Sequence, residues 1–230
     1  MQAIRYNKLL ALALSSVIAF ATEAAAVSCF GGEQDCSDCQ DHVQPLEDED
    51  GYFGALRRLL LENIDAQVYE IWAPSFLPEA AVMLYEKKDD WYVRVASVRD
   101  QVWNLKDSPD GKSVPDFRTH QPVDAIERVF PAELAGRIVL AWRRVLQRTR
   151  TQSKATVTTD GVGYVFGAGD LTGFDANLRC GAGDLMLDVA GSLGLYARAA
   201  NPISRWGLRV RLRNTLTRIE RDEYRKTPAL

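Results

Sequence analysis

The residues of this chain best suited to covalent or metal chemistry are four cysteines: Cys29, Cys36, Cys39 and Cys180. If the chain is exported, as its first residues indicate below, an even number of cysteines is most simply explained by two disulfides. Three connectivities are then open. A bond that joins Cys180 to one of the other three would tie the N-terminal segment to the rest of the chain.

Two other uses of these cysteines are open. Cys36 and Cys39 have the spacing of thiol redox motifs, and with Cys29 and His42 they offer four zinc ligands. Acidic neighbours such as Asp38 should raise the thiol pKa and so disfavour the thiolate that redox catalysis needs. The ligand spacing matches no common zinc module. We therefore predict structural disulfides and expect neither a bound metal nor another cofactor.

Carboxylates near expected turns suggest a second kind of chemistry, at Asp170, Asp175 and Asp184. Glycosidases use two carboxyl groups, about 5 Å apart in retaining enzymes and farther apart in inverting ones. A hydrolase acting on glycan or peptidoglycan through Asp and Glu is therefore one hypothesis. A histidine-based triad is not expected, because the chain has only His42 and His120 and no G-x-S-x-G motif.

The sequence GAGDL occurs twice, at residues 167–171 and 181–185. Neither copy completes a dinucleotide-binding or Walker motif, so nucleotide binding has no support. We expect a hairpin turn at the first copy and a helix start at the second, where free backbone N–H groups could also accept an anion.

The N-terminus has the pattern of a secretory signal peptide. Arg5 and Lys8 precede an apolar run over residues 9–21, and small residues up to Ala26 follow it. Such a run rises only about 20 Å as a helix, against about 30 Å for the hydrocarbon core of a membrane. We predict a signal peptide over residues 1–26, cleavage after Ala26, no transmembrane segment in the mature chain, and a periplasmic or secreted location.

A lipid anchor is the alternative to a free mature chain. The residues before Cys29 resemble a bacterial lipobox, in which small residues precede a cysteine that is then lipidated. The pattern departs from a lipobox at Ala26, where a larger aliphatic residue is usual, and Glu23 places a charge where such signals are normally uncharged. We favour cleavage after Ala26, with lipidation of Cys29 left open.

Charge is distributed unevenly along the chain, although the net charge is only −3. Residues 27–51 carry eight carboxylates and no Lys or Arg, which predicts an acidic arm that is disordered or tethered by disulfides. Residues 52–230 then carry 26 Lys and Arg against 22 Asp and Glu. The chain as a whole has a pI of about 5.5 and so no general attraction to phosphate, and we expect no nucleic-acid partner.

Residues 52–230 are expected to form a single α+β globular domain, in which short antiparallel hairpins pack with about four helices. Periodicity and turn residues predict these elements: a helix over 52–64, a hairpin from strands at 80–85 and 91–103, a loop over 104–122, a strand at 123–130, a helix starting at Pro131, a hairpin over 161–174, and helices over 183–199 and 202–225.

The last helix combines arginines with an apolar side that includes Ile203, Trp206, Leu212, Leu216 and Ile219. Its basic face would suit lipid headgroups, anionic glycans or an acidic partner, but packing of the apolar side is the simpler explanation. Without an assembled catalytic set, we expect an exported, non-catalytic protein that binds and sequesters another envelope protein. The envelope hydrolase and a lipid-anchored structural protein are the alternatives.

Overall fold

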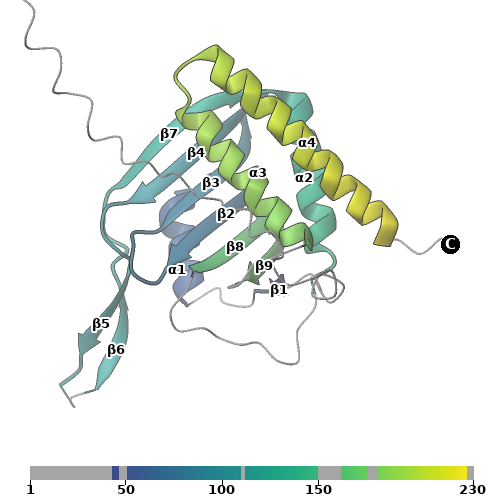
Figure 1. Ribbon diagram of the computed structural model, residues 1–230. Helices are drawn as coiled ribbons and strands as arrows, with labels where there is room; N and C mark the ends of the chain where they lie inside the picture. The colour runs from purple at the N-terminus through teal and green to yellow at the C-terminus, as the bar shows by residue number, and fades with distance from the viewer. Residues whose placement is uncertain (1–42, 47–50, 110–111, 150–161, 176–180, 227–230) are drawn as a thin grey trace, which may run out of the picture. The chain divides into compact units, whose positions relative to one another are not determined.

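The computed structural model describes residues 43–46, 51–109, 112–149, 162–175 and 181–226 (Figure 1). These residues contain four helices and nine strands: β1 (Gln44–Pro45), α1 (Tyr52–Leu61), β2 (Ala66–Pro74), β3 (Ala80–Lys87), β4 (Asp90–Val98), β5 (Trp103–Asp107), β6 (Ser113–Phe117), β7 (Val123–Phe130), α2 (Ala132–Leu146), β8 (Val162–Ala168), β9 (Leu171–Asp175), α3 (Gly181–Arg198) and α4 (Pro202–Lys226). The predicted α+β class is confirmed.

Seven of the strands form one antiparallel sheet in the order β1-β9-β8-β2-β3-β4-β7, and β5 and β6 form a separate hairpin. A two-residue turn joins β3 to β4, in which Lys88 has φ of 54° and Asp89 has φ of 68°. Two consecutive left-handed residues match the right-handed twist of the flanking strands. The long hairpin that the sequence predicted here is confirmed, although β4 ends at Val98 rather than near Trp103.

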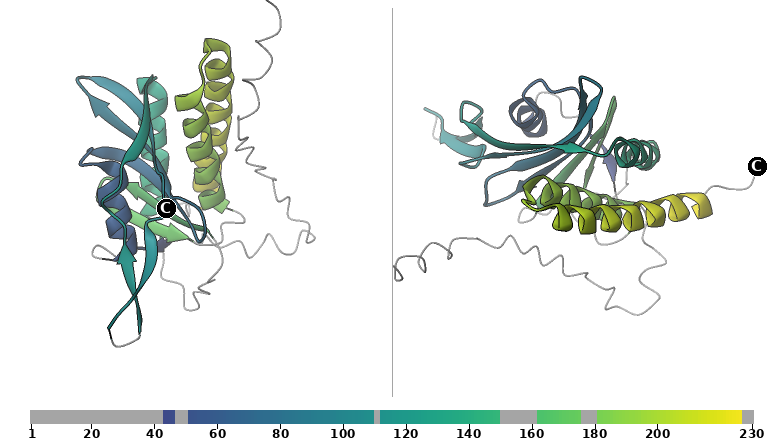
Figure 2. Two further views of the ribbon diagram at one scale, coloured as in Figure 1. Left: turned by 90° about the vertical axis from the view of Figure 1, so that its left-hand side faces the viewer. Right: turned by 90° about the horizontal axis from the view of Figure 1, so that it is seen from above.

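Helices cover both faces of the sheet (Figure 2). On the face covered by α2, α3 and α4, Val93 and Val95 of β4 join a core that includes Trp142 and Phe166. On the other face, alternate residues of β4 join a second core with Leu56 and Leu60 of α1. The buried residues that β4 contributes to this second core are Ala96 and Val98. Because both faces are buried, the interior strand β3 is apolar at almost every position rather than at every second one.

The helices lie close to their predicted positions. The helix predicted to start at Pro131 is α2, with Pro131 at its N-cap position, and residues at helical spacing along it are buried (Leu134, Ile138, Trp142 and Val145). The apolar stripe of α1 also packs as expected, although the helix ends at Leu61, before Ile64. The predicted boundaries of α3 and α4 differ from the observed ones by only one or two residues.

Two features of the sheet region differ from the sequence prediction. Residues 104–122 are not a loop throughout, because residues 104–107 belong to β5 and residues 113–117 form β6. Pro115 suggested a loop, but it lies in a two-stranded hairpin opposite Leu105, where no third strand needs its missing N–H. The central strand β2 was not predicted at all. Its run AQVYEIWAP places Glu70 among apolar residues, which interrupts the apolar pattern expected of a buried strand.

Candidate binding surface

The β5–β6 hairpin projects beyond the edge of the seven-stranded sheet as an arm (Figure 1). Its cross-strand pairs place Trp103 opposite Phe117 and Leu105 opposite Pro115, so these four side chains share one face of the arm. Leu105 is 56% exposed, and Trp103 is also exposed. One face of the arm is therefore apolar over these two pairs, and its Trp103 and Leu105 side chains are open to solvent.

The loop between β2 and β3 adds two more exposed apolar residues at the same end of the sheet. Phe76 is 77% exposed and Leu77 is 52% exposed. The side-chain amide of Gln101, just before β5, donates a hydrogen bond to the carbonyl of Ser75 at 2.6 Å, which joins this loop to the base of the arm. We refer to Phe76, Leu77, Trp103 and Leu105 together as the apolar arm surface.

A buried carboxylate fixes the base of the arm. Glu79 is fully buried (0% exposed), and its Oε2 accepts a hydrogen bond from the backbone N–H of Val102 at 2.8 Å. Its Oε1 accepts from the Tyr52 hydroxyl at 2.5 Å and lies 3.4 Å from the N–H of Trp103. A buried charge is costly unless it is hydrogen-bonded, and these three donors meet that need. The backbone of Glu79 also accepts from the N–H of Val98 at 3.1 Å.

Tyr52 stays a hydrogen-bond donor to this carboxylate. Burial raises the pKa of the Tyr52 hydroxyl, and the hydrogen bond to Glu79 and the charge of Glu79 raise it further. The phenol is therefore protonated throughout the neutral range. Tyr52 of α1 and the backbone at the start of the arm therefore donate hydrogen bonds to the same carboxylate, that of Glu79.

Aromatic rings surround this polar contact. The ring of Tyr52 lies 5.6 Å from that of Trp103 and 5.7 Å from that of Phe117, and these last two rings are also 5.7 Å apart. Centroid distances of this size are those of favourable tilted and edge-to-face aromatic pairs. The arm is therefore packed at its base and exposed farther out.

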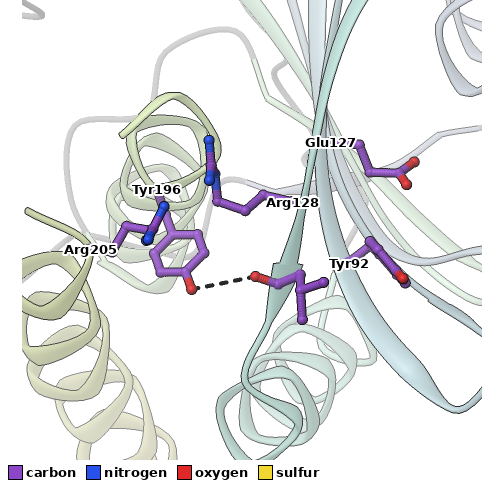
Figure 3. Close-up of a pocket in the computed structure, with 6 residues that line it drawn as sticks. Tyr92, Glu127, Arg128, Tyr196 and Arg205 are labelled. Atoms are coloured by element: carbon purple, nitrogen blue, oxygen red, sulfur yellow. Dashed lines mark hydrogen bonds between the residues drawn. The ribbon is translucent and has the colours of Figure 1, made fainter. Parts of the chain in front are cut away.

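A second feature lies along β7, the edge strand of the sheet (Figure 3). An open pocket of about 460 Å³ is lined by Tyr92, Glu127, Arg128, Val129, Tyr196 and Arg205. Figure 3 shows that Glu127 and Tyr92 point to one side of β7, whereas Arg128, Tyr196 and Arg205 lie on the other side. The charged groups of the pocket therefore do not converge on one point, as a catalytic set would.

The carboxylates proposed for hydrolysis are not brought together as a set. Asp170 lies in the β8–β9 turn, exposed and 3.7 Å from Arg143, whereas Asp175 is at the far end of β9. The five positions from Asp170 to Asp175 span about 17 Å of extended backbone, well beyond either glycosidase spacing. Asp184 lies in the first turn of α3, where burial and the charge of Asp188 raise its pKa and Arg218 lowers it.

Among the described carboxyl groups, the one with the largest pKa shift is Glu70, which the sequence did not single out. Although Glu70 as a residue is only half-buried, desolvation of its carboxyl group under the helices raises its pKa to about 8. Glu70 lies on the same face of the sheet as Tyr164, which is paired with Asp175. Burial raises the pKa of Tyr164, and the charges of Glu70 and Asp175 add to that rise.

The C-terminal helix packs largely as expected. Leu212, Leu216 and Ile219 are fully buried, and Arg211 forms an ion pair with Asp188 at 2.6 Å. The start of α4 differs from the prediction, because Ile203 is 81% exposed and Trp206 is 61% exposed. No helix in the described ranges is long and apolar enough to cross a membrane.

The remaining predicted site residues lie outside the described part of the chain. This applies to Ala26, His42 and all four cysteines (Cys29, Cys36, Cys39 and Cys180). Among the residues that the structure describes, no group of three His, Cys, Asp or Glu side chains could hold a metal ion.

The arm surface was missed because its proline and glycine suggested a loop. The signal that could have found it is the alternation of Trp103 and Leu105 with polar residues, repeated at Pro115 and Phe117 after the turn residues. Glu79 had no such signal, since a glutamate next to a proline usually marks an exposed loop.

No protein-family model, curated protein or solved structure matches this chain.

Proposed function

We propose that this protein is an exported, non-catalytic binding protein that holds another envelope protein through the apolar arm surface. The observation that carries the proposal is the combination of large exposed apolar side chains with a base fixed by a fully buried carboxylate. Contiguous exposed apolar surface marks interaction sites in soluble proteins. Because the Glu79 side chain is hydrogen-bonded to both α1 and the first residues of the arm, it ties the arm to the domain in one geometry.

The arm has little reason to be apolar unless something covers it. A two-stranded hairpin is at best marginally stable in water, and exposed Phe and Leu side chains gain nothing from solvent. A partner that buries Phe76 and Leu105 would stabilise the hairpin and gain affinity from aromatic and aliphatic anchors. The partner would be sequestered if this contact covers the surface that the partner uses for its own function.

Site-specific photo-crosslinking in the expressing cell tests this proposal. A photoreactive amino acid at position 105 or 76 is expected to give a discrete adduct with one protein, because both positions lie on the apolar arm surface. The matched control is position 140 on α2, where Leu140 is 58% exposed but far from the arm in the fold. Leu105→Ser should reduce the adduct formed from position 76 at least about five-fold, given typical anchor energies. Adducts of equal yield from position 140, or none from the arm, would overturn the proposal.

Export is a separate proposal, supported by the charge and hydropathy pattern of residues 1–26. The intact mass of the mature protein should correspond to residues 27–230 and should rise by four hydrogens on reduction, as two disulfides require. A lipid mass on Cys29 in the membrane fraction would instead identify an anchored envelope protein. Retention of residues 1–26 on the mature chain would contradict export by this signal.

The envelope hydrolase remains the second candidate, and one observation favours it. A carboxyl group whose pKa is raised to about 8, like that of Glu70, is protonated near neutral pH, as a general acid must be. A second buried acidic residue, Asp175, lies near the same tyrosine, since the charges of Glu70 and Asp175 both raise the pKa of Tyr164. Loss of glycan hydrolysis in Glu70→Gln, with the fold intact, would support this second function over the first.

A further inference from the structure

Strand β7 leaves one of its two edges without a strand partner in the described part of the chain. It pairs with β4 along its whole length and is the last strand in the sheet order. Its residues Asp124, Ala125, Ile126 and Glu127 are exposed, with Ile126 at 45%. Free edges of this length are templates for pairing with another strand, which is why proteins usually protect or use them.

The hydrogen-bonding direction of each β7 residue follows from its neighbours. Val98 donates its N–H to Glu79, away from β7, so the pair of Val98 and Val123 is not hydrogen-bonded. Pairs alternate along an antiparallel ladder, so Val123, Ala125, Glu127 and Val129 direct their N–H and C=O groups to the free edge. The Tyr196 hydroxyl, which donates to the carbonyl of Val129 at 3.4 Å, agrees with this assignment (Figure 3).

We propose that two copies of this chain associate through their β7 strands, antiparallel and centred on Ile126. In this register Ala125 is hydrogen-bonded to Glu127 of the second copy, and Val123 to Val129, so all four outward-facing residues are used. Between them, Ile126 lies opposite its own copy, and Asp124 lies opposite Arg128 at both ends. Opposite charges at directly facing positions stabilise an antiparallel pair.

The neighbouring registers are less favourable. Centring the pair on Glu127 would place two carboxylates directly opposite each other, which is destabilising. Centring the pair on Ala125 would leave the outward-facing N–H and C=O of Val129 without a partner in β7 of the second copy. It would also place Asp124 opposite Ile126. Charge and hydrogen bonding therefore select the same register.

The surroundings of β7 suit this second strand. Arg128 donates its Nε–H to the carbonyl of Ala197 at 3.0 Å, which holds its guanidinium beside the edge. The open pocket of about 460 Å³ next to Val129 leaves space where Val123 of the second copy would lie. The carbonyl of Val129 has a second lone pair, so its long bond to Tyr196 does not prevent it from accepting a ladder hydrogen bond.

Sedimentation velocity of the purified full chain over a range of concentrations tests the proposal. We expect a monomer–dimer equilibrium. Asp124→Arg or Arg128→Asp alone should raise the dissociation constant of the dimer at least about ten-fold. Residue 124 faces residue 128 at both ends of the strand pair, so each substitution creates two facing pairs of like charge. The double variant Asp124→Arg/Arg128→Asp should return the dissociation constant to within about three-fold of the parent value, since it restores opposite charges. Asp116→Arg, on the exposed arm, is the control and should change nothing.

A second measurement addresses the register without charge changes. Ile126→Cys should form a disulfide-linked dimer under mild oxidation, because residue 126 faces itself across the two-fold axis, whereas Asp124→Cys should not. The parent chain gives the background of its native cysteines. A monomer at every concentration, a dimer that Asp124→Arg leaves intact, or equal cross-linking of the two cysteine variants would each overturn the proposal. None of these outcomes bears on the arm.

Discussion

Glu79→Ala is expected to lower the free energy of unfolding by about 3–5 kcal/mol, because it leaves several buried donors without an acceptor. The change removes a fully buried carboxylate on which three donors converge: the N–H groups of Val102 and Trp103 and the hydroxyl of Tyr52. These donors would remain buried without an acceptor, and that desolvation cost adds to the lost hydrogen bonds. Equilibrium unfolding in urea measures the effect.

The matched control is Tyr52→Phe, which removes one donor and leaves the carboxylate with two. Its expected cost is about 1 kcal/mol. Amide hydrogen exchange should separate a local effect from a global one, because Glu79→Ala should accelerate exchange at Val102 and Trp103 more than in α2. Equal losses of stability in the two variants would show that Glu79 does not hold the arm as described.

Glu70→Gln is expected to make the protein more stable at pH 8 and above while changing it little near pH 4.5. The pKa of Glu70 is about 8 in the folded chain, against an ordinary value of 4.5. Between these two values the folded state holds a proton that the unfolded state has lost, so the stability of the parent falls as pH rises through this window. The slope for one such group is at most about 1.4 kcal/mol per pH unit.

The total effect across the window is of the order of 2–4 kcal/mol, since partial solvent access at Glu70 reduces it. Glutamine cannot ionise and nearly matches the protonated acid in shape, so the pH-dependent loss should disappear in the variant. Glu86→Gln, an exposed position on the neighbouring β3, is the control and should keep the parent's pH profile. A profile in Glu70→Gln that parallels the parent's would contradict the assignment.

Local patterns predicted the helices and most hairpins because their packing follows simple periodicity. The stripe from Leu134 to Val145 has helical spacing, and it is buried as that spacing requires. Strand β2 could not be predicted in this way, because burial on both faces removes the alternation that marks a strand. Its centre is also occupied by Glu70, an acidic residue that interrupts the apolar run, and burial raises the pKa of its carboxyl group to about 8.

The candidate binding surface was harder to predict than the fold. Three donors converge on Glu79 from α1 and from the start of the arm, and the most distant of these, on Tyr52, lies 27 residues away. Such convergence depends on tertiary packing and leaves no local pattern. The register proposed for the β7–β7 dimer likewise depends on which backbone N–H and C=O groups of β7 face the free edge. Only the pairing of β7 with β4 decides that.

The central position of β2 has a consequence for how the nascent chain folds. On one side β2 pairs with β3 through a short loop, but its other neighbour is β8, where Tyr69 lies opposite Gly167 across 98 positions of sequence. Strands β2, β3, β4 and β7 can therefore assemble from nearby contacts, whereas closure by β8 carries a much larger loop entropy. Until then the open side of β2 presents an unpaired apolar edge. If the chain crosses a membrane before it folds, that interval is when mispairing and aggregation are most to be expected, and when a holding chaperone would matter most.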